Sequence, residues 1–292
     1  YKMDQYDLEY EYFLDSEKNS ENLELDYFTK LDTEKKVYIL SQINNIQKHE
    51  DNDIPLKFKI LSSDMDTNTK SIAISQSNKC DTMDTTSGEY NKTKQWINGL
   101  IQIPFNKFTS LPVSDNDSIS DKKKFLVDTN KILNDAIYGH TSAKNHILQV
   151  MSKWIKNPQS GGNILAIQGP MGNGKTTLVK KGIAKAIGRP FHFIALGGAS
   201  DSSSFDGHHY TYEGSKYGRI VEILIQSKCM NPIFYFDELD KISDTQKGDE
   251  IVHLLTHLTD TSQNDKFHDN YFSGIDIDLS KALFIFSFND EN

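Results

Sequence analysis

Short apolar runs alternate with amphipathic stretches in the C-terminal half of the chain. Three such runs predict buried strands, and they cover residues 164–167, 232–236 and 282–286. Apolar residues then recur at helical spacing after the first run: Leu178, Val179, Ile183 and Ala186. This helix is predicted to end at Gly188. The order of strands and helices predicts an α/β domain with a parallel sheet flanked by helices.

The N-terminal half shows helical periodicity only in places. A helix is predicted over 34–48, where four apolar residues share a face: Val37, Leu40, Ile43 and Ile46. Residues 1–30 are acidic and rich in aromatic side chains, compatible with an ordered helical arm that packs on a neighbour or with a tail cut from a larger structure. Residues 64–89 are rich in Ser, Thr, Asp and Asn, and we interpret them partly as a loop.

A boundary is predicted between these two halves. The apolar cluster from Trp96 to Ile103 stops at Pro104, and 109–121 resembles a linker in its Pro and Asp content. A helix is expected over 125–137, and Thr141 is expected to cap a second helix. We therefore expect a mainly helical or mixed region over 1–124 and the α/β domain over 125–292.

The loop after the first predicted strand has the residue types that bind phosphate. It consists of Gly169, Pro170, Met171, Gly172, Asn173, Gly174, Lys175, Thr176 and Thr177. Glycines allow successive backbone N–H groups to turn toward an anion, and the helix that follows adds its positive end. Lys175 is predicted to contact the β and γ phosphates, and Thr176 to offer its hydroxyl to Mg²⁺. The loop predicts a site for ATP with Mg²⁺.

Two carboxylates follow the second predicted strand directly. Asp237 is predicted to hold Mg²⁺, through water, and Glu238 to deprotonate the water that attacks the γ phosphate. Ligands of open α/β sheets bind at the carboxyl ends of the strands, which is where this pair would lie.

Asn289 follows the third predicted strand. Its amide could hydrogen-bond the γ phosphate or the attacking water and so report whether the nucleotide is intact. It is equally compatible with a turn, because Asn-Asp favours turns.

Composition and charge narrow the function classes. The 292-residue chain has a formal net charge of −9, and residues 1–60 contribute 14 acidic and 8 basic side chains. Such a surface repels phosphate backbones and argues against nucleic acid as the main partner.

Cys80 and Cys229 have no metal-binding spacing, and no apolar stretch reaches the ~20 residues that cross a bilayer. A reducing, intracellular and most simply cytoplasmic setting is expected.

Further motifs follow one another in order along the C-terminal part. They occupy 137–140 (IYGH), 196–201 (LGGASD), 207–214 (GHHYTYEG), 237–241 (DELDK) and 267–272 (FHDNYF). Together with the phosphate loop they resemble the AAA+ ATPase module of Lon proteases. The resemblance covers roughly 132–292, and a weaker likeness extends to the helical segment around 96–104. It implies a P-loop parallel-sheet core and assembly into a ring, by resemblance a hexamer.

The resemblance also implies roles for matching residues. Tyr138 and Gly139 would border the adenine, although an aromatic residue beside a glycine can also serve packing alone. Tyr212 matches the aromatic residue of the loop that lines the central pore, where it would press on a protein substrate; the alternative is a half-buried strand tyrosine. The loop 243–248 matches the second pore loop.

The chain departs from the Lon pattern at several positions. Met171 replaces a proline, residues 208–210 (HHY) stand where a histidine and two arginines are usual, and Glu213 replaces an apolar residue. The helical lid, the trans-acting arginine and the serine-lysine peptidase domain are not expected within 1–292, and the sheet is expected to keep four of five strands, with an open edge beside 164–167.

The resemblance and the motifs favour a Mg²⁺-ATP-dependent unfoldase that feeds polypeptide to a Lon-type peptidase. A nucleotide-gated binding or assembly scaffold without proteolysis is the alternative. A DNA-handling ATPase is a third hypothesis, which the acidic charge opposes.

Overall fold

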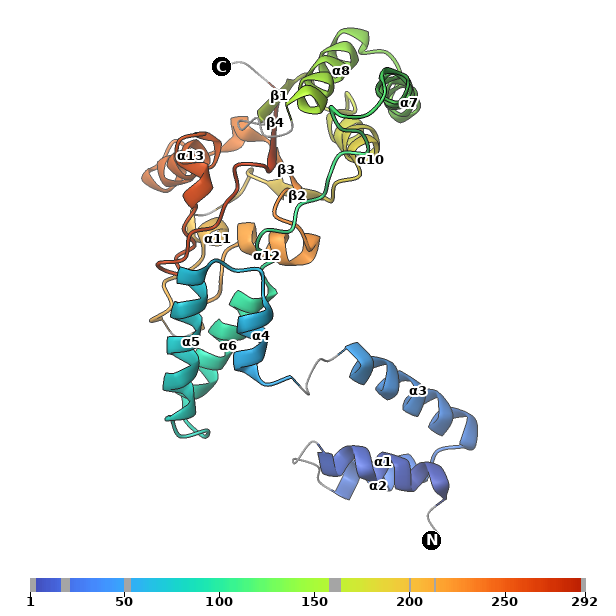
Figure 1. Ribbon diagram of the computed structural model, residues 1–292, viewed down its shortest axis with the longest axis vertical. Coiled ribbons are helices and arrows are strands. Elements are labelled where there is room, and N and C mark those ends of the chain that lie inside the picture. Colours follow the sequence, from blue (N-terminus) through green and yellow to red (C-terminus); the bar gives the residue numbers. More distant parts are fainter. Residues whose placement is uncertain are drawn as a thin grey trace. The chain divides into compact units, whose positions relative to one another are not determined.

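The computed structural model describes residues 4–16, 22–49, 54–157, 164–199, 201–212 and 214–289 (Figure 1). The chain forms two compact units, Tyr1–Phe58 and Lys59–Asn292. The boundary expected from the sequence between residues 124 and 125 lies inside the second unit, and it stays a prediction.

The described residues of the first unit form α1 (Gln5–Ser16), α2 (Asn22–Thr29) and α3 (Thr33–His49), and α4 (Leu56–Ser62) spans the division between the units. Leu14, Phe28 and Leu40 are buried among these helices. The helix predicted over 34–48 is confirmed as α3. The acidic N-terminal stretch is helical in α1 and α2, and its packing on a neighbour stays a prediction.

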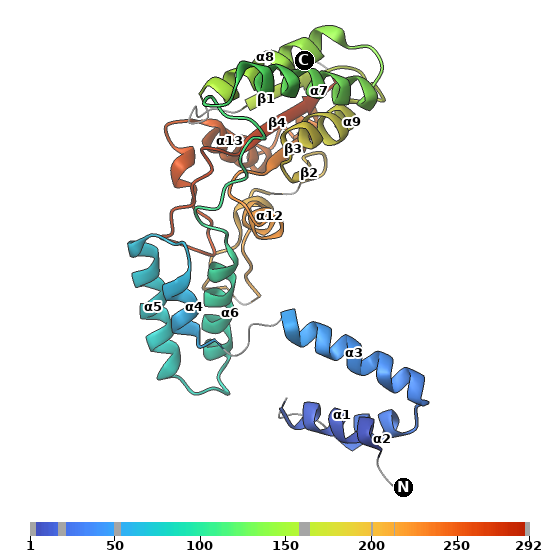
Figure 2. The same ribbon diagram turned by 45° about the vertical axis from the view of Figure 1, so that its right-hand side comes forward.

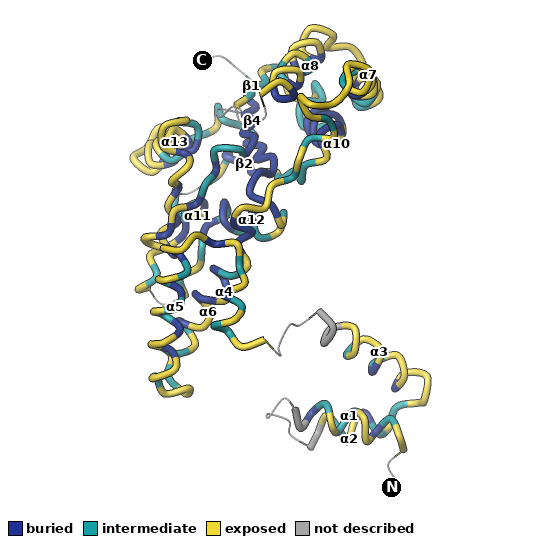
Figure 3. Tube along the Cα trace, in the orientation of Figure 1, coloured by how far each residue is buried: buried dark blue, intermediate teal, exposed yellow. Residues whose placement is uncertain are grey.

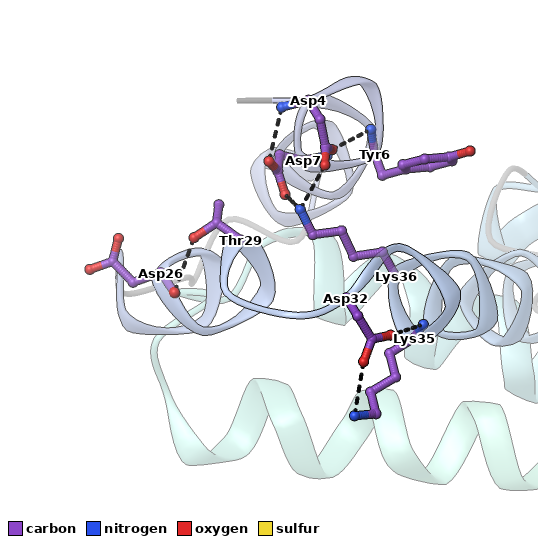
Figure 4. A network of polar contacts seen from close by, with 8 residues as sticks. All are labelled: Asp4, Tyr6, Asp7, Asp26, Thr29, Asp32, Lys35 and Lys36. Carbon is purple, nitrogen blue, oxygen red and sulfur yellow. Dashed lines mark hydrogen bonds and ion pairs between the residues drawn. The ribbon is translucent and has the colours of Figure 1, made fainter. Parts of the chain in front are cut away.

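A buried lysine holds two of these helices together (Figure 4). The Nζ atom of Lys36, on α3, lies 2.6 Å from Asp7 Oδ1 and 2.8 Å from Asp4 Oδ2, at the start of α1. Hydrogen bonds to Asp4 and Asp7 raise the pKa of Lys36, and the hydrogen bond from Lys36 lowers the pKa of Asp4. The buried ammonium group of Lys36 is therefore paired with two carboxylates, which offset the cost of removing its charge from water.

The second unit begins with a helical pair, α5 (Thr67–Asp81) and α6 (Gly88–Gln102). Of residues 64–89, which we interpreted partly as a loop, 67–81 are helical, and 82–87 form the loop between α5 and α6. Asp66 caps α5 by accepting hydrogen bonds from the backbone N–H groups of Asn68 and Thr69. The buried residues of α5 are small and recur at helical spacing: Thr69, Ala73, Ser77 and Cys80. Small side chains allow α5 to pack closely on α6, although they give little hydrophobic signal.

The next two helices start elsewhere than predicted. Helix α7 (Ile119–Ala136) begins within the predicted linker because the Ser118 hydroxyl accepts a hydrogen bond from the Asp121 N–H. Helix α8 (Thr141–Lys156) has Thr141 as its first helical residue, so Thr141 is not the cap. The residue before the helix is His140, which has a φ of 53° and no capping side-chain hydrogen bond.

In the part of the chain that the structure describes, four parallel strands form the sheet in the order β1-β4-β3-β2. They are β1 (Ile164–Gln168), β2 (Phe191–Ala195), β3 (Ile233–Asp237) and β4 (Leu283–Phe288). The three strands predicted from apolar runs are confirmed, and β2 was not located by the pattern. Within the described residues β1 lies at an edge, as expected for the strand before the phosphate loop.

Both faces of the sheet are covered, with α7, α8 and α10 on one side and α13 on the other (Figures 1 and 2). Ile233, Tyr235 and Ile285 face the first side, where the core includes residues of α7 and α8. On the alternate positions Phe234 stacks on Phe284 and Phe236 on Phe286, with ring centroids 5.4 and 5.1 Å apart. The central strands β3 and β4 are therefore almost wholly buried (Figure 3).

The helix after the phosphate loop is continuous but not uniform. It consists of α9 (Lys175–Thr177), the π-helical segment η1 (Leu178–Ile183) and α10 (Ala184–Ile187). Gly188, with a φ of 67°, ends it at the predicted residue. The predicted helix is confirmed, with a π-helical turn that the spacing did not indicate.

The remaining elements are short, apart from α12 and α13. They are α11 (Ser203–Asp206), α12 (Arg219–Ser227), η2 (Leu239–Lys241), α13 (Gln246–Thr259) and η3 (Asn264–Lys266).

The Trp96 indole on α6 donates to the Tyr271 carbonyl at 2.9 Å, and Trp96, Tyr271 and Phe272 form part of an aromatic cluster. This cluster joins the α5–α6 pair to the α/β core. Across the described residues, every helix is too short or too polar to span a bilayer.

Candidate functional site

The register of the sheet brings the predicted site residues to one edge. Gln168 at the end of β1 pairs with Phe288 in β4, so the phosphate loop and Asn289 leave adjacent strands at the same level. Asp237 ends β3, which pairs with β4 on its other side. A cavity of about 380 Å³ lies at this edge, and its lining residues are Met171, Gly172, Asn173, Gly174, Lys175, Thr176, Thr177, Asp237, Glu238 and Asn289.

The loop around the cavity depends on glycine at two positions. Gly172 and Gly174 have φ angles of 76° and 79°, in the left-handed region that other residues rarely adopt. Gly174 precedes the first turn of α9, so the N-terminus of the helix opens toward the cavity. Backbone N–H groups and the helix dipole there favour an anion.

Lys175 joins the two ends of the loop. Its Nζ atom donates hydrogen bonds to the carbonyls of Gly169, at 2.5 Å, and Pro170, at 3.2 Å. It also donates to Asn289 Oδ1 at 2.9 Å. Gly169 and Pro170 do not line the cavity, and their contact with a nucleotide stays a prediction. Asn289 lies close to the lysine predicted to bind phosphate.

The acidic pair, Asp237 and Glu238, also lines the cavity. Asp237 Oδ1 accepts hydrogen bonds from the Ser287 hydroxyl and from the Glu238 N–H, the latter at 3.1 Å. Glu238 has a φ of 60°, which is uncommon for a residue with a side chain and occurs often at functional sites. A Cβ atom on Gly197 would lie only 2.3 Å from Glu238 Oε2, so the carboxylate rests against a residue without a side chain.

Three residues of the site were missed by the sequence analysis: Gly197, Tyr235 and Ser287. The Tyr235 hydroxyl lies 3.2 Å from Thr176 Oγ1, beneath the loop. A tyrosine inside an otherwise apolar strand and a serine two residues before Asn289 were the available signals. Neither signal indicates a partner until the register of β3 and β4 is known.

The two residues expected at the adenine are not brought to this cavity. The Tyr138 side chain is 99% exposed, and neither Tyr138 nor Gly139 lines the cavity. Only their neighbour Ile137 approaches the loop, since a Cβ on Gly174 would lie 3.2 Å from its Cγ2. A role for Tyr138 and Gly139 at the base stays a prediction.

Tyr212 lies far along the sequence from these residues, in the loop that begins at Gly207. Its side chain is 67% exposed, which differs from the half-buried strand alternative. Its backbone N–H donates to the His209 carbonyl at 3.0 Å, and its ring lies edge-on to the His209 ring. Glu213 lies outside the described residues. In the segment matched to a second loop, Thr245 caps α13 by accepting from the Gly248 N–H.

Comparison with known proteins supplies the family. Residues 165–290 match the model of the ATPase family associated with various cellular activities (AAA). The chain is 36% identical over 259 residues to a Lon protease homolog of Acanthamoeba polyphaga mimivirus, an alignment that covers 86% of this chain and 24% of that protein.

Bacterial relatives show similar identities. The Lon protease of Malacoplasma penetrans is 32% identical over 253 residues, covering 87% of this chain and 30% of the relative. Lon protease 1 of Bacillus subtilis is 32% identical over 265 residues, covering 88% of this chain and 32% of the relative. The chain thus spans about a quarter to a third of the length of these curated relatives. With the phosphate loop, the acidic pair and Asn289 around one cavity, these matches identify the chain as carrying an AAA ATPase module of the Lon type.

Proposed function

We propose that the chain binds ATP with Mg²⁺ in the cavity at the strand ends and hydrolyses it to drive movement of protein substrates. The observation that carries the proposal is the convergence of Lys175, Thr176, Asp237, Glu238 and Asn289 on one cavity. Lys175 and Thr176 lie at the start of a helix, and the other three residues lie at the carboxyl ends of β3 and β4, where open α/β sheets bind their ligands.

Each side chain has a proposed task that suits its chemistry. Lys175 contacts the β and γ phosphates in place of its carbonyl partners, and Asn289 holds the γ phosphate or the attacking water. Glu238 accepts a proton from that water. Thr176 and Asp237 offer oxygen atoms, which Mg²⁺ prefers, and both line the cavity. When bound, Mg²⁺ supplies positive charge to the phosphate oxygens.

Glu238→Gln tests the hydrolytic part of the proposal. The amide keeps the shape of the side chain but cannot take a proton, so turnover should fall about a hundredfold or more. Binding of a fluorescent ATP analogue should stay close to that of the unchanged protein, because Glu238 is not among the phosphate-contacting residues. Full hydrolysis by the variant would remove Glu238 as the base.

The exposed Tyr212 supports a mechanical role for its loop. We infer that the ring contacts polypeptide substrates within a ring of identical subunits, a hexamer by resemblance, in which a neighbour completes each ATPase site. In the whole protein this motor would feed a peptidase, as the names of the Lon relatives indicate for those proteins. The buried thiols of Cys80 and Cys229 are both free, in keeping with a reducing compartment.

Tyr212→Ala separates this role from ATP hydrolysis. In a protein that includes the remaining domains, basal ATPase activity should be retained while unfolding of a tagged substrate slows, because the exposed ring is lost and the cavity is untouched. Unfolding at the unchanged rate would reject the gripping role.

A further inference from the structure

The only hydroxyl in the apolar strand β3 belongs to Tyr235. Its side chain is fully buried, and its ring packs between Phe191 and Phe193 of β2, with centroids 5.6 and 5.9 Å away. The ring therefore belongs to the core that supports the helix after the phosphate loop. Only the hydroxyl leaves this apolar environment, and it reaches Thr176 Oγ1 at 3.2 Å.

Thr176 also lines the cavity, at the start of α9. The hydrogen bond between Thr176 and Tyr235 therefore connects a residue of the cavity to the buried core of the sheet.

A hydroxyl group has one proton and two lone pairs. The hydrogen bond with Tyr235 occupies one of these positions on Thr176, and the buried Tyr235 ring is held by its aromatic neighbours. This contact restricts the Thr176 side chain and leaves a lone pair of Oγ1 available to a metal ion.

We propose that Tyr235 is a positioning residue for the divalent cation: its hydroxyl orients the Thr176 hydroxyl beneath the phosphate loop. The inference rests on the proposed function, in which Thr176 and Asp237 hold Mg²⁺. It extends the cation site to a residue in the core that does not touch the metal. Its expected effect is on the affinity for Mg²⁺ rather than on contacts to the nucleotide.

Tyr235→Phe in the full chain tests the proposal, because it removes only the hydroxyl and keeps the ring. Binding of N-methylanthraniloyl-ATP is measured in EDTA and over a MgCl₂ titration, and binding of Mn²⁺ with ATP is followed by electron paramagnetic resonance. Affinity in EDTA should be unchanged. The Mg²⁺ concentration for half-maximal enhancement should rise about two- to tenfold, the value of one net hydrogen bond.

Tyr271→Phe is the matched control, since it removes another buried phenol outside the cavity. The double variant Thr176→Ala with Tyr235→Phe should require no more Mg²⁺ than Thr176→Ala alone, because Tyr235 acts through Thr176. An additive loss in the double variant, or a Tyr235→Phe titration that matches Tyr271→Phe, would overturn the positioning role.

Two further variants distinguish this failure from failure of the proposed function. Thr176→Ala and Asp237→Asn should each weaken the Mg²⁺ enhancement more than Tyr235→Phe does. If both leave it unchanged, the cation site itself is wrong. If both weaken it while Tyr235→Phe does not, only the role of Tyr235 is rejected.

Discussion

At the scale of single residues, Gly197 limits where Glu238 can lie. The segment after β2 passes so close to the Glu238 carboxylate that a Cβ on Gly197 would lie 2.3 Å from Oε2. Gly197 does not have a positive φ, so its backbone can accept an alanine. The close contact would therefore be relieved by moving the end of the Glu238 side chain. A side chain at Gly197 would displace the Glu238 carboxylate and leave the fold unchanged.

Gly197→Ala should therefore reduce ATP turnover while leaving the protein folded. Displacing a catalytic group by about 1 Å can slow a reaction about a hundredfold. ATP affinity and the melting temperature should change little, and Gly88→Ala is the control, since a Cβ there meets nothing within 4 Å. Turnover equal to that of the Gly88 variant would show that Glu238 does not depend on this contact.

The residues that bind phosphate could be predicted because their types and spacing carry the chemistry. The positions of Lys175, Asp237 and Glu238 follow from the phosphate loop and from the strand before the acidic pair. All three residues line the same cavity in the structure. Tyr235 could not be predicted in the same way, because its partner Thr176 lies 59 residues away and the contact depends on strand register. The role of Tyr138 was predicted from resemblance alone, and its exposed ring does not line the cavity.

At the scale of elements, a buried carboxylate fixes the base of the loop that carries Tyr212. Asp269 is fully buried and accepts hydrogen bonds from the N–H groups of Gly218, at 2.7 Å, and Tyr271, at 2.9 Å. A Cβ on Gly207 would lie 2.8 Å from its Oδ1. Burial raises the pKa of Asp269 to about 7 and that of nearby Asp206 to about 6.

These raised pKa values predict that stability falls as the pH rises. The ordinary value for both groups is 3.8, so between about pH 4 and 7 the folded chain binds more protons than the unfolded chain. The free energy of unfolding should therefore decrease across that window, as measured by urea denaturation at several pH values. A stability that rises from pH 4 to 7 would contradict the assignment.

Asp269→Asn should flatten this dependence and also destabilise the protein. An amide places N–H against a backbone N–H, and one lost buried hydrogen bond costs about 1–3 kcal/mol. Asp265→Asn, which changes an exposed carboxylate in the same segment, controls for the lost charge. A slope as steep in the Asp269 variant as in this control would assign the pH dependence to other groups.

Among whole elements, the strands β1, β3 and β4 were easier to predict than helix α5, whereas β2 was not located. The β3 and β4 strands are buried on both faces, so they are short, continuous apolar runs. Helix α5 packs through Thr69, Ala73 and Ser77, whose small or polar side chains resemble a loop in sequence. The cap Asp66 was the signal that could have identified its start.

At the scale of the whole molecule, one nucleotide should connect the elements that surround the cavity. The phosphate loop, the end of β3 and the end of β4 are joined in the structure by Lys175, Asn289 and the Thr176–Tyr235 contact. A triphosphate would add a ligand common to all three. The chain spans only part of its relatives' length, so the ring and the peptidase are properties to be tested in the whole protein.

Hydrogen–deuterium exchange of the full chain with increasing ATP and Mg²⁺ tests this central claim most directly. Amides in 169–177, at 237–238 and at 289 should become protected together, with the same dependence on ATP concentration, and Lys175→Ala should abolish all three effects. Protection confined to other segments, or a loop that becomes protected while the ends of β3 and β4 do not, would contradict a single nucleotide held between them.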